Sequence, residues 1–421
     1  MDERSVITAF LTDRGEVLLL RRSEEVGTYS GRWGGVSGYI EPGETPMQAA
    51  RREITEETGL SPEAVSLLAR GEPFQVSDRE ADIRFTVHPF RFETDSRDVQ
   101  DNWETDDLQW VSPPAIRDLR TVPDLWTSWD RVRPTVESVR TNTTDGSATI
   151  SRRALEVLRD EAALLAEEGG DWSAIASVAS ELKAARDAMA VVRVRVDRAM
   201  ARASEDRTPA AVRAAASAGI ERALRADRRA ASAAASRIEG RTVFTLSRSG
   251  TVEEAIELGG PDAVRIAVSR PGGEGRDLAN ALAEAGQAVT LLGDTNVPRG
   301  VQGADVVLVG ADTVLPNGDV INKAGTTAAA LAAEWEAVPV YAACATAKIS
   351  PEEVRSPADL EANVGEQSGD LAADSNVAVL DPPFERTPAG LLDGVLTEDG
   401  LLDESAIAGV AADHAALAGW E

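Results

Sequence analysis

The alternation of apolar and polar residues divides the chain into three stretches. In the first stretch, apolar runs at residues 5–10 and 16–20 predict strands, and an alternating run at 83–92 predicts another. Residues 45–58 have the composition and spacing of a helix. Strands mixed with a helix in this way indicate an α+β domain, which we expect to end near Pro134.

Residues 134–240 have a different pattern. Their apolar residues recur every three or four positions, as in Leu155, Leu158 and Ala162, and this spacing predicts amphipathic helices packed as a bundle. The Ala- and Arg-rich run 209–237 is also compatible with a low-complexity segment. A helix is favoured there, because Ala and Arg are strong helix formers and no proline follows the first residue of the run.

From residue 241 onward, continuous apolar runs alternate with helical patterns. The runs that predict strands are 242–246, 263–268, 288–292, 305–309 and 338–342. The patterns that predict helices are 251–258, 277–285 and 324–336. Continuous apolar strands separated by helices indicate an α/β fold with a parallel sheet covered on both faces. Ligands of such sheets bind at the carboxyl ends of the strands, so the loops after the strands carry the candidate chemistry.

The net charge of the chain narrows the possible functions more than its length does. The 421 residues predict two to three domains at roughly 150 residues each. Lys and Arg number 43 against 71 Asp and Glu, so the net charge is −28, which argues against direct nucleic-acid binding. With 43% apolar residues the chain should nevertheless fold. Only Lys183, Lys323 and Lys348 are lysines. This acidic, Arg-rich surface resembles that of halophilic archaeal proteins, where salt screens the repulsion.

The single cysteine, Cys344, permits no intramolecular disulfide and fits a reducing compartment. By its position after a strand we expect it to be a buried apolar residue. The first residues lack a signal-peptide pattern, and no apolar run reaches the roughly 18 residues of a membrane span. We therefore expect a cytoplasmic protein that does not associate with a membrane.

Three glutamates of the first stretch form a candidate metal site. On a helix, Glu53, Glu56 and Glu57 stand at positions i, i+3 and i+4, so their carboxylates share one face and repel one another unless a cation lies among them. Carboxylate oxygens suit Mg²⁺, with Mn²⁺ as the alternative. In isolation this spacing is more often a solvated helix with Glu–Arg pairs.

Here the glutamates stand inside a longer motif. The matching positions are Gly38, Glu44, Arg52, Glu53, Ile54, Glu56, Glu57, Gly59 and Leu60. Residues 1–133 thereby resemble Nudix hydrolases. The resemblance implies an α/β/α sandwich, in which the three glutamates bind the metal and Arg52 orients them. It also implies cleavage of a nucleoside diphosphate linked to a group X. Glu104 is our candidate for an additional ligand or base, with an ordinary surface glutamate as the alternative.

The loops of the third stretch hold candidate anion contacts. Residues 245–251 combine hydroxyls, an arginine and the start of a helix, which is typical of a phosphate cradle but also of an ordinary N-cap. Lys323 stands in a Gly-rich loop of a chain that otherwise avoids lysine, which suggests an anion contact. A surface lysine without a function is the alternative.

These loops belong to an ordered set of motifs from residue 134 to the end. The set comprises 145–150, 184–186, the Arg270 loop, 310–312, 322–323 and 397–400. The set resembles the family that joins regulatory subunits of translation initiation factor 2B to ribose 1,5-bisphosphate isomerase and methylthioribose 1-phosphate isomerase. The resemblance implies a helical subdomain at 134–240, a Rossmann-like ligand-binding domain at 241–421, and a homo-oligomer.

In the isomerases of this family a Cys and an Asp move a proton between adjacent sugar carbons. Asp312 matches the Asp, but Ser247 stands in the place of the Cys, and a hydroxyl is a far poorer acid or base than a thiol. The residues predicted to contact a sugar phosphate or nucleotide are Arg186, Ser247, Arg270, Asp312, Asn322 and Lys323. We therefore expect a Mg²⁺-dependent Nudix hydrolase whose C-terminal unit binds such a ligand without isomerase activity. The alternatives are a bifunctional enzyme that is also an isomerase, and a regulatory protein similar to initiation factor 2B.

Overall fold

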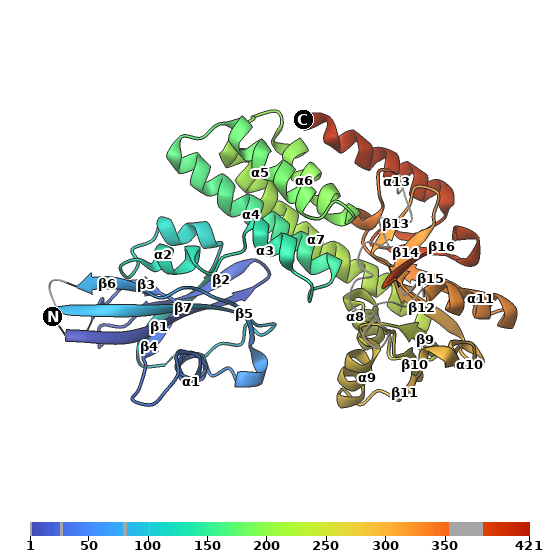
Figure 1. The fold of residues 1–421 in the computed structure, drawn as a ribbon, viewed down its shortest axis with the longest axis horizontal. Helices are drawn as coiled ribbons and strands as arrows, with labels where there is room; N and C mark the ends of the chain where they lie inside the picture. Colours follow the sequence, from blue (N-terminus) through green and yellow to red (C-terminus); the bar gives the residue numbers. More distant parts are fainter. Residues whose placement is uncertain (1, 26–27, 79–81, 101, 353–381) are drawn as a thin grey trace, which may run out of the picture. The chain divides into compact units, whose positions relative to one another are not determined.

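Two units make up the computed structural model (Figure 1). The structure describes residues 2–25, 28–78, 82–100, 102–352 and 382–421. The first unit comprises Met1–Thr135 and Arg159–Gly169, and the second comprises Val136–Leu158 and Gly170–Glu421. Within the described ranges, no helix is both long and apolar enough to cross a membrane.

A mixed eight-stranded sheet forms the centre of the first unit. Its strands are β1 (Asp2–Asp13), β2 (Glu16–Arg22), β3 (Trp33–Gly34), β4 (Val36–Tyr39), β5 (Ser66–Arg70), β6 (Phe74–Asp78), β7 (Ile83–Glu93) and β8 (Thr105–Val111). Its helices are α1 (Pro46–Thr58) and α2 (Leu125–Asp130), with short 3₁₀ turns η1 (Pro62–Ala64) and η2 (Pro113–Arg117). β1 and β7 pair in parallel, and the remaining neighbours are antiparallel. The predicted strands 5–10, 16–20 and 83–92 are confirmed as parts of β1, β2 and β7.

The two faces of this sheet carry separate cores. Side chains alternate along β1, so Ile7 and Leu11 pack with Ile54 of α1, while Phe10 points to the opposite face. There the ring of Phe10 meets the ring of Trp129 from α2 edge to face, with the centroids 5.2 Å apart. The helices α1 and α2 therefore cover opposite faces of the sheet (Figure 1), which is the predicted α/β/α arrangement.

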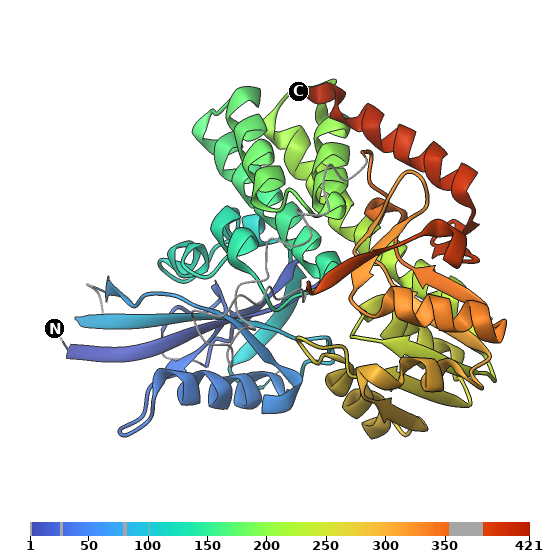
Figure 2. The same ribbon diagram turned by 45° about the vertical axis from the view of Figure 1, so that its right-hand side comes forward.

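The second unit begins with helices, coloured green in Figure 2. They are α3 (Val136–Thr141), α4 (Ser147–Glu168), α5 (Trp172–Ala185), α6 (Ala190–Ala203) and α7 (Pro209–Ile238). The residues of α4 from Arg159 onward belong to the first unit. The predicted helix 209–237 is confirmed as α7. Thr208 caps it by accepting a hydrogen bond from Ala211 N–H, and Pro209 occupies the first turn, where no N–H partner is needed. The buried face of α7 consists mainly of alanines.

A seven-stranded sheet follows in the order β11-β10-β9-β12-β15-β17-β18. The strands are β9 (Thr242–Leu246), β10 (Ala263–Ala267), β11 (Val289–Leu292), β12 (Val306–Gly310), β15 (Val340–Ala343), β17 (Gly394–Thr397) and β18 (Gly400–Leu402). The helices are α8 (Gly250–Gly259), α9 (Gly275–Glu284), α10 (Val297–Val301), α11 (Thr326–Glu336) and α13 (Glu404–Ala416). All neighbours are parallel except β17 and β18, so the predicted α/β fold class is confirmed.

Both faces of this sheet are covered, which explains its continuous apolar strands. Val306 and Leu308 of β12 pack with α7, α8 and α9, whereas Val307 and Val309 pack with α10, α11 and α13. In sequence order, β10 and β11 are added on one side of β9, and β12, β15, β17 and β18 are added on the other side. The carboxyl ends of β9 and β12 therefore form the topological switch point, where open α/β sheets bind ligands. A small separate sheet contains β13 (Thr313–Val314), β14 (Val320–Lys323) and β16 (Phe384–Thr387).

Candidate functional site

The helix α1 is fixed at both ends by its own sequence. Thr45 accepts from the N–H of Gln48, and the Gln48 side chain accepts from the N–H of Thr45, which together form a capping box. Gly59 ends the helix in the left-handed conformation at φ 71°, which a residue with a Cβ adopts at a cost. With Ile54 buried against the sheet, the predicted glutamates lie on and beside the adjacent face.

Arg52 joins the acidic residues of this face. Its Nε donates to Glu44 Oε1 at 3.0 Å, and its Nη1 donates to Glu53 Oε1 at 2.8 Å and to Glu56 Oε2 at 3.1 Å. Its Nη2 donates to the carbonyl of Tyr39 at 3.0 Å. One guanidinium thus binds three carboxylates, two of which, Glu53 and Glu56, are among the three glutamates that Arg52 was expected to orient.

Glu57 lies deeper than the other glutamates. Its side chain is buried, and Oε1 accepts from the N–H of Ser37 at 3.2 Å. Burial raises the pKa of Glu57 to about 8, and the negative charges of Glu53 and Glu104 add to the shift. Burial also raises the pKa of Glu53, although Arg52 opposes this. Both carboxyls therefore hold a proton more readily than an exposed glutamate does.

Gly38 leaves the space that Glu53 occupies. A Cβ at this position would lie 1.8 Å from Glu53 Oε1, so even alanine would force the carboxylate to move. This close approach gives the glycine of the motif a physical reason.

Glu104 precedes β8 and faces the same carboxylates. The Asn102 side chain accepts from the N–H of Glu104 at 2.9 Å and donates to the backbone carbonyl of Glu56 at 3.2 Å. The charge of Glu104 raises the pKa of both Glu53 and Glu57. Glu104 is therefore held near the end of α1.

The donor set suits a divalent cation in its chemistry, because crowded carboxylates with raised pKa values are stabilised by positive charge. Within the described ranges, no three acidic, His or Cys side chains are gathered around one point as metal ligands. Glu53 and Glu56 instead bind Arg52. A metal held by these glutamates would replace part of the Arg52 contacts.

In the second unit, Ser247 follows β9 at the switch point. It adopts φ 60°, an uncommon conformation for a residue other than glycine, and its N–H donates to Ser269 Oγ at 2.6 Å. Asp294 then accepts from the N–H groups of Ser269 at 2.6 Å and Arg270 at 3.0 Å. These bonds tie together the loops that follow β9, β10 and β11. The Arg270 side chain is exposed and has no partner in the described part of the chain.

Asp312 lies at the other side of the switch point, just after β12. Its Oδ1 accepts from the hydroxyl of Ser147 at 3.0 Å, at the start of α4. Nearby, Gly310 leaves room for Ser249, because a Cβ there would come within 2.6 Å of Ser249 Oγ. Ser247 and Asp312 thus follow neighbouring strands, at the end of the sheet where the carboxyl ends of the strands lie.

Asn322 and Lys323 end β14 and are both buried. The Asn322 amide donates to Thr326 Oγ1 at 3.0 Å. The Lys323 Nζ donates to Glu274 Oε1 at 2.7 Å, so its charge already has a partner.

Arg186 makes its contacts to the backbone. It ends α5, and its guanidinium donates to the carbonyl of Val139 at 2.8 Å and to the carbonyl of Asn142. Burial lowers the pKa of Arg186. These contacts hold the segment between α3 and α4, and within the described residues the guanidinium makes no ion pair with a carboxylate.

Lys348 lies beside Asp312, and the sequence analysis did not propose it as a site residue. Its Nζ is buried and donates to the carbonyl of Ala311 at 2.6 Å, next to Asp312. The rarity of lysine, which singled out Lys323, applied equally to Lys348. Cys344 is confirmed as a buried residue, and burial raises the pKa of its thiol to about 12.

Two family models match the chain. Residues 1–131 match the NUDIX domain, and residues 143–404 match the Initiation factor 2 subunit family. Ribose 1,5-bisphosphate isomerases of Archaeoglobus fulgidus and Haloferax volcanii are each 34% identical over 170 residues, covering 39% and 38% of this chain. Since 54% and 53% of those proteins are covered, the chain spans about half the length of the curated relatives it matches. The crystal structure of the Pyrococcus horikoshii OT3 translation initiation factor eIF-2B is similar, with 25% identity and a TM-score of 0.53 over 63% of this chain and 94% of that one.

Proposed function

Because this chain belongs to the initiation factor 2 subunit family and carries a NUDIX domain at residues 1–131, we propose that it is a Mg²⁺-dependent hydrolase with a ligand-binding second unit. The substrate is a nucleoside diphosphate linked to a group X, and Mn²⁺ is the alternative ion. The observation that carries this proposal is the set of carboxylates gathered around Arg52, with Glu57 buried beside them.

Each residue of the first site has a role in this proposal. Glu53, Glu56 and Glu57 would hold the metal, which when bound would neutralise diphosphate oxygens and activate water for attack on phosphorus. Arg52 orients Glu53 and Glu56 through its three-way contact. Glu104, whose backbone N–H donates to Asn102, would accept a proton from the attacking water.

In the second unit we propose binding of a sugar phosphate or nucleotide without isomerase chemistry. Arg186, Ser247, Arg270, Asp312, Asn322 and Lys323 are the proposed contacts. Ser247 supplies a hydroxyl where the isomerases have a thiol. Cys344 cannot replace that thiol, because burial raises its pKa to about 12. The identity to ribose 1,5-bisphosphate isomerases favours a second candidate, a bifunctional enzyme.

Phosphorus NMR of the protein in concentrated KCl with Mg²⁺ tests both proposals. ADP-ribose, other nucleoside diphosphate derivatives and ribose 1,5-bisphosphate are supplied in separate tubes. We expect loss of diphosphate resonances, which Glu56→Gln abolishes and Glu63→Gln, an exposed glutamate of η1, leaves intact. A change confined to the bisphosphate tube would instead establish the isomerase. No change in any tube would favour a regulatory protein.

We also propose that the domains divide near residues 133 and 240 and that the protein is a homo-oligomer in a salt-rich cytoplasm. The net charge of −28 supports the salt requirement. Sedimentation across a KCl series measures the oligomeric state and its dependence on salt. A monomer at every salt concentration contradicts the proposed homo-oligomer.

A further inference from the structure

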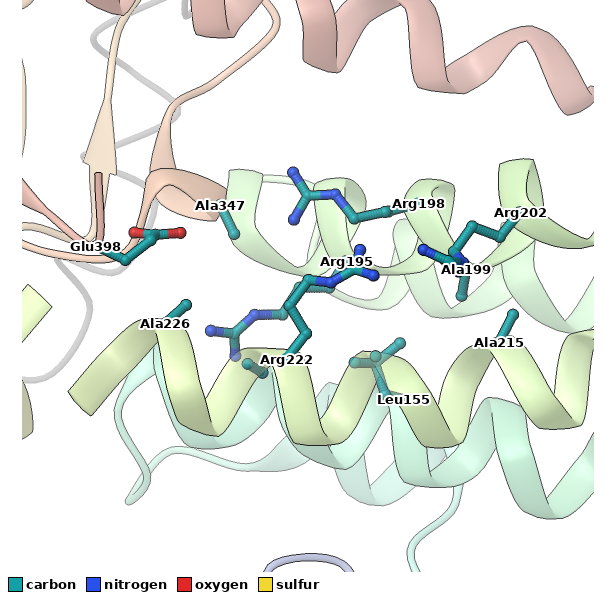
Figure 3. A pocket seen from close by; sticks show the side chains of 12 residues that line it. Leu155, Arg195, Arg198, Ala199, Arg202, Ala215, Arg222, Ala226, Ala347 and Glu398 are labelled. Atoms are coloured by element: carbon teal, nitrogen blue, oxygen red, sulfur yellow. The ribbon is translucent and has the colours of Figure 1, made fainter. Parts of the chain in front are cut away.

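A pocket between α6 and α7 carries four arginines (Figure 3). Arg195, Arg198 and Arg202 stand at positions i, i+3 and i+7 of α6, so they share one helix face. Arg222 reaches the pocket from α7, and Glu398 is the one acidic residue that lines it in the described part of the chain. None of the six proposed ligand contacts of the switch point lines this pocket.

Small side chains on α7 face the arginines. The residues of α7 that line the pocket, apart from Arg222, are Ala215, Gly219, Ala223 and Ala226. Of the four arginines, Arg195 is buried and Arg202 is exposed.

Carboxylates offset part of the positive charge of the four arginines. Arg195 donates to Asp227 at 3.0 Å. Glu398 is held by the N–H of Thr346 at 2.7 Å and by its hydroxyl at 2.6 Å. The charges of Glu398 and Asp399 both act on Arg198, so three carboxylates oppose four guanidinium groups.

Within the described part of the chain, the other three arginines make no direct ion pair with a carboxylate. Arg198 donates to Nε2 of His414 at 2.9 Å, and because Arg can only donate, this imidazole nitrogen is an acceptor. Arg202 and Arg222 have no hydrogen-bond or ion-pair partner among the described residues. Burial lowers the pKa of Arg198, and the positive charges of Arg222 and Arg195 lower it further, while the negative charges of Glu398 and Asp399 oppose the shift. A bound anion would relieve this repulsion.

We propose that the arginine pocket binds a phosphate dianion, either free or as the phosphate group of a small phosphomonoester. Arg202 and Arg222 have no partner among the described residues, and their guanidinium donors match the geometry of phosphate oxygens. The cluster of arginines in the pocket is opposite in sign to the net charge of the chain, which is −28. The inference does not depend on hydrolase activity in the first unit.

Isothermal titration calorimetry tests the site directly, with inorganic phosphate and ribose 5-phosphate as probes and the full chain kept folded in KCl. We expect Arg222→Gln to weaken binding by roughly tenfold or more, because a charge-assisted hydrogen bond contributes about 1.5–3 kcal/mol. Arg202→Gln, at an exposed position, should act in the same direction and guards against misfolding of the first variant. Arg225→Gln on the same helix, which pairs with Glu221 outside the pocket, is the matched control.

The switch point could also bind phosphate, so Lys323→Gln is titrated in parallel. Binding that survives Lys323→Gln and weakens in Arg222→Gln and Arg202→Gln supports the pocket. Tighter binding of the inorganic ion assigns the free anion, and tighter binding of the sugar phosphate assigns the phosphomonoester. Absence of binding, or binding that is lost in Lys323→Gln and unchanged in both arginine variants, overturns the proposal.

Discussion

The two units distribute charge in opposite ways at their candidate sites. In the first unit, Glu53 and Glu56 share the guanidinium of Arg52, and the buried Glu57 accepts from the N–H of Ser37. In the second unit, Lys323 is already paired with Glu274. A site of crowded carboxylates is stabilised when it binds a cation. A site with internal pairs has to exchange a protein contact for each contact to its ligand.

The largest expected effect concerns the reactivity of Cys344 in the second unit. A reactive thiolate there would contradict the proposal that this unit lacks isomerase chemistry. With a pKa of about 12 the thiol is almost entirely protonated at pH 8. We expect its alkylation in the folded protein to be about a thousandfold slower than in the unfolded chain, where the pKa is about 8.5. Mass spectrometry of iodoacetamide-treated protein measures this ratio. Rapid alkylation of folded protein would reopen the isomerase reading.

Gly38→Ala tests how closely the first site is packed. The new Cβ would displace the Glu53 carboxylate, and we expect hydrolysis to fall by about 100-fold, the upper range for losing an orienting contact at a metal site. Gly34→Ala is the control, since its Cβ would lie at an ordinary 3.7 Å from Val122. Equal activity of the two variants would show that the position of Glu53 is unimportant.

Arg52→Gln sharpens the comparison by removing the shared cation. The variant loses the contacts to Glu44, Glu53 and Glu56, and we expect kcat/KM to fall about 10- to 100-fold. A steeper Mg²⁺ dependence should accompany this loss, because the carboxylates are no longer oriented. Arg51→Gln, at the preceding position of α1, is the matched control. An unchanged Mg²⁺ profile in Arg52→Gln would refute the orienting role.

Glu274→Gln probes the internal pair of the second unit. It releases Lys323, so we expect ribose 1,5-bisphosphate to bind roughly three- to tenfold more tightly, which is about 0.7–1.4 kcal/mol. Calorimetry measures the change. Glu284→Gln, an exposed glutamate at the end of the same helix, should leave the affinity unaltered. Weaker binding in Glu274→Gln would mean that the glutamate itself contacts the ligand.

The fold followed from the sequence where burial leaves a local signature. The predicted strand 242–246 coincides with β9, because a strand covered on both faces is apolar throughout. The predicted strand 5–10 is part of β1, which extends over Asp2–Asp13. Its first residues, Asp2–Arg4, are polar and exposed and are held in the sheet by pairing with β7, so no apolar pattern marks them.

The candidate sites were predictable to different degrees for the same reason. Arg52 contacts Glu53 and Glu56 within one helix, so residue spacing alone brings these charges together. The partners of Arg186 lie 44 and 47 positions away in the chain, and Lys323 is 49 positions from Glu274. Only tertiary packing decides such contacts. Residue type identified these cations as candidates, but it could not predict that protein groups already bind them.

The alanine face of α7 has a thermodynamic consequence. Alanine has no rotamers to lose, so its burial costs almost no side-chain conformational entropy. Each alanine also removes little apolar area from water, and the heat-capacity increment of unfolding scales with that area. This layer of helices therefore unfolds with a small heat-capacity increment per residue. Its free energy of unfolding varies less steeply with temperature than that of the aromatic core around Phe10 and Trp129.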